Sequence, residues 1–172
     1  MLKARYLKMM SVLTIAVGMG ISPSARVAAQ TVDPEDEGRA LVGSWMVQVT
    51  LRNCQTHMPV GAPFLSLLTY ESGGTTTDTT SNPQFGPNQR GPGHGVWIHT
   101  GKHAYKVLGV AFVTKSTDGS LVSTFFLNQR INVKTPDEYD VTAYAQFIGP
   151  DGKTVLSSGC STAVGRRIEL EK

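Results

Sequence analysis

Three histidines come closest, by type and spacing, to residues that could hold a metal ion. His94, His99 and His103 fall within ten residues, and neutral imidazole is a common zinc ligand. No aspartate or cysteine at a regular spacing completes a ligand set around them. Histidines near turns are often simply exposed, so we predict neither a metal site nor a cofactor.

Recognised catalytic motifs are missing from the sequence. It has no Gly-x-Ser-x-Gly elbow, no HExxH and no P-loop. The threonine-rich run 73–80 holds one carboxylate, Asp78, and a strand with one wet face, or an edge strand, explains it without a catalytic role. Catalytic residues therefore stay unassigned. If the protein were an enzyme, the polar side chains to suspect would be Tyr105, Gln129 and Tyr139.

The first 29 residues have the layout of a secretory signal peptide. A basic start is followed by an apolar run at 9–21 and by small residues at 27–29. This mainly apolar run of 13 residues is shorter than the roughly 20 that a membrane-spanning helix needs. We therefore expect a secreted or periplasmic bacterial protein without stable membrane insertion.

The charge of the chain changes once this segment is set aside. The formal net charge is +3, but four of the 16 basic residues lie within the first 29 positions, which leaves 12 against 13 acidic residues. A nearly neutral domain without a basic stripe gives no electrostatic reason to expect a nucleic acid partner.

Apolar residues recur with period two from Leu41 onward, between turn residues, which is typical of half-buried β-strands. Residues 30–40 are predicted to be a disordered leader and residues 41–172 a single domain. Short turns rich in Gly, Pro and Asp join the later strands and predict an antiparallel meander. The eight predicted strands lie at 43–54, 63–72, 75–81, 95–100, 103–115, 120–134, 139–148 and 154–170.

A closed sheet would remove the two exposed edges of such a meander. Cys54 in the first strand and Cys160 in the last are predicted to form a disulfide, because an exported chain meets an oxidising compartment. If Cys54 and Cys160 are directly opposite each other, the numbers of any two opposed residues in these strands add up to 214. Trp45 is then opposite residue 169, and Arg167 lies two residues away on the same face of the last strand. We predict an all-β fold with one closed antiparallel up-and-down barrel of about eight strands. An Ig-like β-sandwich is the alternative.

Gly43 and Trp45 in the first strand, with Arg167 near the end of the last, resemble the hallmark of the calycins, the superfamily of lipocalins, fatty-acid-binding proteins and avidins. The chain is most similar to bacterial lipocalin-like proteins and to the allene oxide cyclase type of barrel. The resemblance implies an Arg packed on the Trp face at the closed end. Only Trp45 and Trp97 are present, so biotin is a poor candidate ligand.

Trp45 is predicted to point into the barrel, so alternate residues of the first strand, counted from Trp45, face the interior. In the last strand, the alternate residues that share the face of Arg167 are small, which leaves room for a small apolar ligand. A mouth is expected near the Pro- and Gly-rich connection 82–94, predicted to be a long mobile loop. The predicted ligand-binding residues are Tyr105, Phe125, Gln129, Tyr139, Phe147, Gly159 and Ala163.

Three functions stay open from the sequence. The first is an exported carrier or sequestering protein for a small hydrophobic molecule. The second is a barrel cyclase or isomerase of the allene oxide cyclase type, acting on an unsaturated apolar substrate. The third is an interaction module whose barrel is filled by its own aromatic side chains. Ligand identity and oligomeric state are left open.

Overall fold

The computed structural model describes residues 38–170, which belong to one compact unit. The predicted signal peptide, residues 1–29, and the leader as far as residue 37 lie outside the described residues. Gly38 and Arg39 form a helical turn that precedes the first strand, and Leu41 after it is completely buried. Within residues 38–170, no helix has the length and apolar character needed to cross a membrane.

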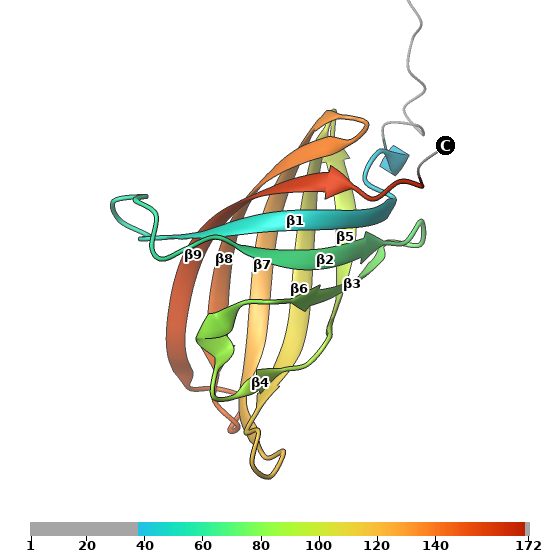
Figure 1. Cartoon of the computed structure of the whole chain (residues 1–172). Coiled ribbons are helices and arrows are strands. Elements are labelled where there is room, and N and C mark those ends of the chain that lie inside the picture. Colours follow the sequence, from blue (N-terminus) through green and yellow to red (C-terminus); the bar gives the residue numbers. More distant parts are fainter. Residues whose placement is uncertain (1–37, 171–172) are drawn as a thin grey trace, which may run out of the picture. The chain divides into compact units, whose positions relative to one another are not determined.

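Nine strands form one antiparallel sheet within the described residues (Figure 1). Eight are the strands that the sequence predicts, with ends shifted by a few residues, and the two-residue β4 is the addition. A short 3-10 helix, η1 (Pro83–Phe85), precedes β4. The strands are β1 (Gly43–Arg52), β2 (Phe64–Tyr70), β3 (Thr75–Thr80), β4 (Gln89–Arg90), β5 (Gly93–Gly101), β6 (Ala104–Thr114), β7 (Leu121–Thr135), β8 (Glu138–Ile148) and β9 (Val155–Arg167).

The sheet closes on itself. β1 pairs with β2 on one side and with β9 on the other, and β6 pairs with both β5 and β7. Figure 1 shows the cyan β1 alongside the red β9, the two ends of the meander. β4 pairs with the end of β6, beyond the last residue that β5 contacts there. The predicted closed eight-stranded barrel is confirmed, and a β-sandwich is excluded.

The seam between β1 and β9 differs from the predicted register by two residues. Trp45 is directly opposite Arg167, and Arg52 is opposite Cys160. Opposed numbers therefore sum to 212, and the predicted sum of 214 is wrong. The reason is that β1 ends at Arg52, so Cys54 lies in the following turn and reaches back to Cys160. The predicted disulfide itself is confirmed, with the two Cα atoms 5.2 Å apart.

Trp45 and Arg167 close one end of the barrel. The Trp45 side chain is completely buried, and its indole N–H donates to the Leu41 carbonyl at 2.9 Å. The Arg167 guanidinium lies 4.3 Å above the indole ring and donates to three carbonyl oxygens, those of Ala40, Val42 and Pro136. Gly43 is required here, because it has a φ of +132° and a Cβ would lie 2.6 Å from Nη1 of Arg167.

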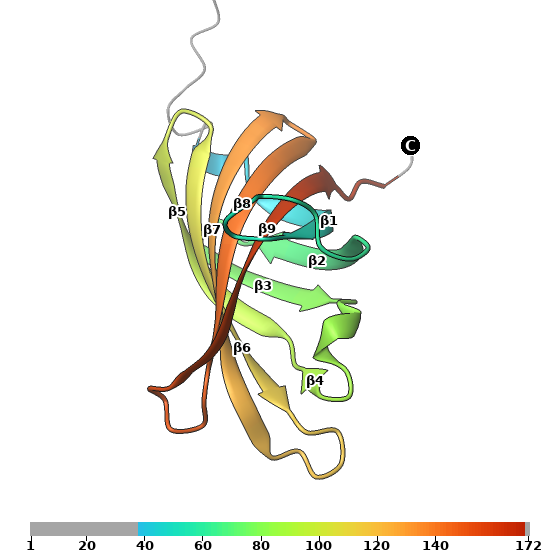
Figure 2. The ribbon, with the colours of Figure 1, turned by 90° about the vertical axis from the view of Figure 1, so that its left-hand side faces the viewer.

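Alternation along the strands separates the core from the outer surface. In β6, buried residues alternate with exposed or half-buried ones over its whole length, as the period-two pattern predicts. The core has two parts. A larger cluster surrounds Trp45 and Tyr139 at the closed end, and a smaller one surrounds Phe125. Figure 2 shows the β6–β7 and β8–β9 hairpins extending beyond the shorter β1, β2 and β3.

Candidate ligand-binding cavity

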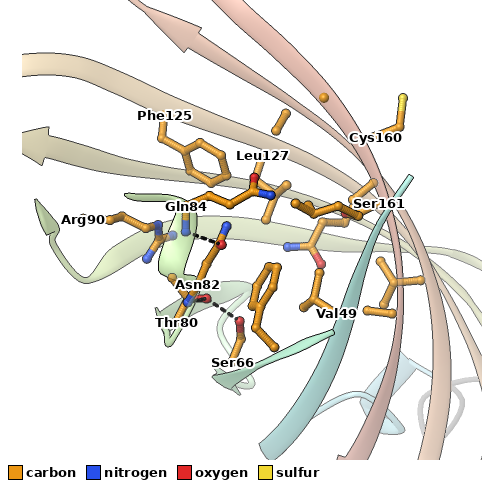
Figure 3. A pocket seen from close by; sticks show the side chains of 18 of the residues that line it. Val49, Ser66, Thr80, Asn82, Gln84, Arg90, Phe125, Leu127, Cys160 and Ser161 are labelled. Carbon is orange, nitrogen blue, oxygen red and sulfur yellow. Dashed lines mark hydrogen bonds between the residues drawn. The ribbon is translucent and has the colours of Figure 1, made fainter. Parts of the chain in front are cut away.

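A cavity of about 350 Å³ lies inside the barrel. This volume falls within the range of sites that hold small molecules. Figure 3 shows Ser66, Thr80, Asn82 and Arg90 on one side of the cavity and Cys160 on the opposite side. The apolar part of the lining comprises Val47, Val49, Leu51, Val60, Phe64, Leu68, Phe85, Phe125, Leu127, Val141, Ala143, Ala145, Phe147 and Ala163.

Strand β9 forms the small-residue wall of the cavity. An ideal Cβ built on Gly159 meets no atom within 4 Å, so open space faces this position. Gly165 lies on the same face of β9, but the space beside it is occupied, because a Cβ there would overlap the Tyr139 ring. The run of small residues therefore has two roles. One end of it leaves the cavity open, and the other makes room for the Tyr139 ring.

The structure divides the predicted ligand-binding residues into two groups. Tyr105 and Tyr139 belong to the closed-end core, where Tyr139 packs 4.6 Å from the Trp45 ring and Tyr105 packs 5.8 Å from the Trp97 ring. Neither tyrosine lines the cavity. The predicted residues that do line it are Phe125, Gln129, Phe147, Gly159 and Ala163.

Gln129 lies at the boundary between the two core clusters. Along β7 it separates Leu127, which packs against the Phe125 cluster, from Ile131 in the closed-end core. Its residue exposure is 9%. Among residues 38–170 its side-chain amide has no hydrogen-bond partner. An unpaired amide with two donors and an acceptor thus lies among apolar neighbours on the β7 wall of the cavity.

An ion pair in the cavity wall was missed in the sequence analysis. Asp78 does not occupy a wet face or an edge, because β3 lies between β2 and β5. Its carboxylate is 2.6 Å from the Arg90 guanidinium, and the two side chains are only 15% and 4% exposed. Gly93, the residue opposite Asp78 on β5, leaves the necessary space, because a Cβ there would overlap the Asp78 carboxylate.

Burial dominates the electrostatics of this pair. It raises the pKa of the Asp78 carboxyl above its usual value, and the nearby Arg90 charge opposes the rise without reversing it. Arg90 also lies 5.2 Å from the centre of the Phe125 ring and donates to the Gly91 carbonyl. The guanidinium thus faces one carboxylate, one ring and one carbonyl, and its charge is compensated inside the protein.

The connection between β3 and β5, predicted to be a long mobile loop, contains the short helix η1 and the strand β4. Asn82 caps η1 by accepting from the Gln84 amide N–H. The Phe85 ring then packs against the cavity, 5.8 Å from Phe125 and 6.0 Å from Phe147. The location of the predicted mouth is supported, since Asn82, Gln84 and Phe85 all line the cavity. Only the apolar Phe85 within this Pro- and Gly-rich segment could have signalled its inward packing.

The three histidines do not gather into a site. His99 shares a hydrogen bond of 2.6 Å between Nε2 and the Lys102 carbonyl, and its ring lies 4.9 Å from that of Tyr105. His94 lies in β5 opposite Val110. Within the described part of the chain, no group of three or more His, Cys, Asp or Glu side chains could hold a metal ion.

Comparisons with known proteins assign this chain to no family. No protein-family model and no curated protein matches the sequence, so the calycin resemblance stays a prediction. A solved structure of EF1p2_mFAP2b bound to DFHBI is 13% identical, with a TM-score of 0.49 over 76% of this chain and 95% of that chain. A redesigned β-barrel, b11L5F_LGL, is 15% identical, with a TM-score of 0.43 over 76% and 93%. The class of protein is therefore defined by this chain's own strand pairing, as a closed eight-stranded antiparallel barrel with an internal cavity.

Proposed function

We propose that this protein is an exported carrier or sequestering protein that binds a small hydrophobic molecule inside its barrel. The disulfide between Cys54 and Cys160 suits an oxidising compartment, and the first 29 residues have the composition of a secretory signal. Its location would then be extracellular or periplasmic.

The observation that carries this proposal is the unfilled space beside Gly159. An eight-stranded barrel can be filled by its own side chains or can hold one small ligand. Here the aromatic residues Phe125 and Phe147 pack with Phe85 at one side of the cavity, and they leave about 350 Å³ unfilled. A filled barrel that acts only through protein partners does not fit this geometry.

The first test is native mass spectrometry of the protein purified from its own host, followed by denaturing extraction of any bound molecule. A stoichiometric apolar passenger is expected. A solution test uses the neutral solvatochromic probe prodan, whose emission shifts to the blue in an apolar environment. Saturable binding with one site per chain is the expected result.

A matched pair of variants places this binding inside the barrel. Gly159→Phe adds a ring where the structure has open space, and should weaken prodan binding at least tenfold. Val164→Phe adds bulk to an exposed position of the same strand and should bind prodan like the wild type. Both variants should keep the wild-type circular dichroism spectrum. An unchanged affinity in folded Gly159→Phe would refute the cavity as the binding site.

The barrel cyclase or isomerase is the second candidate function. Asp78 and Gln129 support it, because both present polar groups to an apolar cavity, as shaping of a reactive substrate requires. The same extraction experiment separates the two functions. A carrier returns the loaded compound with its structure unchanged, whereas an enzyme returns a rearranged isomer of equal mass, and chromatography of the extract distinguishes them.

A further inference from the structure

The polar groups of the cavity wall limit the chemical class of the ligand more strictly than the volume of the cavity does. Gln129 is the starting point, because its amide is buried on the β7 wall of the cavity and has no hydrogen-bond partner within residues 38–170. A buried amide without partners costs free energy relative to its hydrated state in the unfolded chain. A ligand that restores these hydrogen bonds recovers that cost on binding.

The chemistry of the amide defines what such a ligand presents. Nε2 of Gln129 donates two hydrogen bonds and Oε1 accepts. A carbonyl, a hydroxyl or a primary amide on the ligand would match these groups. The residues on either side along the same face of β7, Leu127 and Ile131, are apolar. The part of the ligand that lies along β7 therefore needs one polar group, at Gln129, with apolar atoms on either side of it.

Among residues 38–170, the cavity wall presents no unpaired cation next to Gln129. Arg90 is paired with Asp78 at 2.6 Å, and both side chains are mostly buried. The other arginine of the lining, Arg52, donates to the Thr162 hydroxyl and the His57 carbonyl and has no carboxylate partner in the part of the chain that the structure describes. It lies on β1, three strands from Gln129, because Gln129 pairs with Ala143 on β8, Ala143 with Ser161 on β9, and Ser161 with Leu51, the neighbour of Arg52. An ionised carboxylate at Gln129 would lose its hydration without gaining a positive partner, which is strongly unfavourable.

We propose that the ligand is a neutral amphipathic molecule, an apolar chain or ring with one carbonyl, hydroxyl or amide group that Gln129 binds. A free fatty acid in its ionised form is disfavoured. This inference rests on the proposed function, since it names the ligand class of the same cavity.

The test is displacement of prodan by four ten-carbon ligands at about pH 8, where a carboxylic acid is ionised. The ligands are decanamide, decan-1-ol, sodium decanoate and dec-1-ene. For the wild-type protein, the amide and the alcohol should displace prodan at concentrations about tenfold lower than decanoate. Dec-1-ene, which has no polar group, measures the apolar contribution alone.

Gln129→Leu then removes the hydrogen-bonding groups at nearly constant size. Decanamide and decan-1-ol should weaken about five- to tenfold, whereas dec-1-ene should bind as before. Asn128→Leu, at the exposed neighbouring position, should leave all four affinities unchanged. Gln129→Met serves the same purpose if the leucine variant does not fold.

Two outcomes would overturn the inference and leave the proposed function standing. One is a preference for decanoate in the wild type. The other is an unchanged affinity for the amide and the alcohol in folded Gln129→Leu or Gln129→Met. Failure of the wild type to bind prodan and all four ligands would instead overturn the proposed function, and the inference with it.

Discussion

Gly165 and Tyr139 are directly opposed in the β8–β9 pairing, and the Tyr139 ring occupies the space that a side chain at residue 165 would need. Gly159 lies on the same face of the same strand, yet no atom lies within 4 Å of its ideal Cβ. One strand thus uses glycine for two purposes, close packing at the closed end and open volume in the cavity.

This contrast predicts opposite tolerance to one added methyl group. Gly165→Ala should lower the free energy of unfolding by about 2 kcal/mol, because it overpacks the core against a fully buried ring. Gly159→Ala should change it by less than about 0.5 kcal/mol. Urea denaturation of both variants provides the measurement. Equal effects would show that the Tyr139 ring can move aside.

Removal of the unpaired amide should stabilise the empty protein. Gln129→Leu replaces a buried polar group that has no partner within residues 38–170, so we expect the free energy of unfolding to rise by about 1 kcal/mol. Asn128→Leu on the exposed side of β7 is the control and should have little effect. A loss of stability in Gln129→Leu would mean that the amide is hydrogen-bonded in solution.

The Asp78–Arg90 pair should respond asymmetrically to the loss of each partner. Asp78→Ala leaves a guanidinium that cannot lose its proton, and should cost about 3 to 5 kcal/mol. Arg90→Met should cost less, because the raised pKa of Asp78 lets the carboxyl become neutral.

The double variant should cost less than the sum of the two single variants, as expected for residues in direct contact. Chemical denaturation of all four proteins completes the cycle. Additive effects would contradict the buried ion pair that the structure shows.

The disulfide should contribute strongly to stability because it spans 106 residues. A cross-link over a loop of this length constrains the unfolded chain and is expected to contribute about 4 kcal/mol. The Cys54→Ser/Cys160→Ser double variant should therefore unfold at a much lower urea concentration than the wild type. Unfolding of the wild type with and without a reductant gives a second measurement. Coincident curves would argue against the bond.

The β8–β9 turn should carry an acid-sensitive carboxylate. Asp151 accepts hydrogen bonds from the Lys153 and Thr154 amides and from the Thr154 hydroxyl. The Thr154 hydroxyl first, and then these amides, lower the pKa of Asp151 to about 2. Because the pKa is lowered in the folded protein, ionised Asp151 stabilises the fold at pH values above its ordinary pKa of 3.8. This stabilisation is lost as the pH falls from 3.8 towards 2.

NMR titration of the Asp151 carboxyl measures this pKa directly. Thr154→Val removes the hydroxyl donor and keeps the amide donors, so it should return the pKa part of the way towards its ordinary value. A normal titration of Asp151 in the wild type would contradict the turn geometry.

The strands could be predicted from sequence because each depends on local alternation. β6 shows this clearly, since its buried positions follow parity from end to end. The seam was predicted through two pairs of residues, Cys54 with Cys160 and Trp45 with Arg167. The predicted register of the β1–β9 pairing was wrong by two residues, because sequence alternation does not show that β1 ends before Cys54.

The polar side of the cavity could not be predicted in the same way. Asp78 and Arg90 lie in segments without apolar periodicity, and their pairing depends on Gly93 and on how the connection after β3 folds. Tyr105 and Tyr139 share the interior parity of the strands, but parity does not tell the closed-end core from the cavity. That distinction depends on position along the barrel axis, which only the strand registers define.

The seam between β1 and β9 also determines when the barrel can form. Pairs such as Trp45 and Arg167 join the first strand to the last, so the ring stays open on the ribosome until β9 has been synthesised. Closure then brings together residues far apart in the chain, which slows folding relative to folds built from local contacts. A chain whose barrel closes late stays unfolded for longer, as the proposed export through a narrow translocation channel would require.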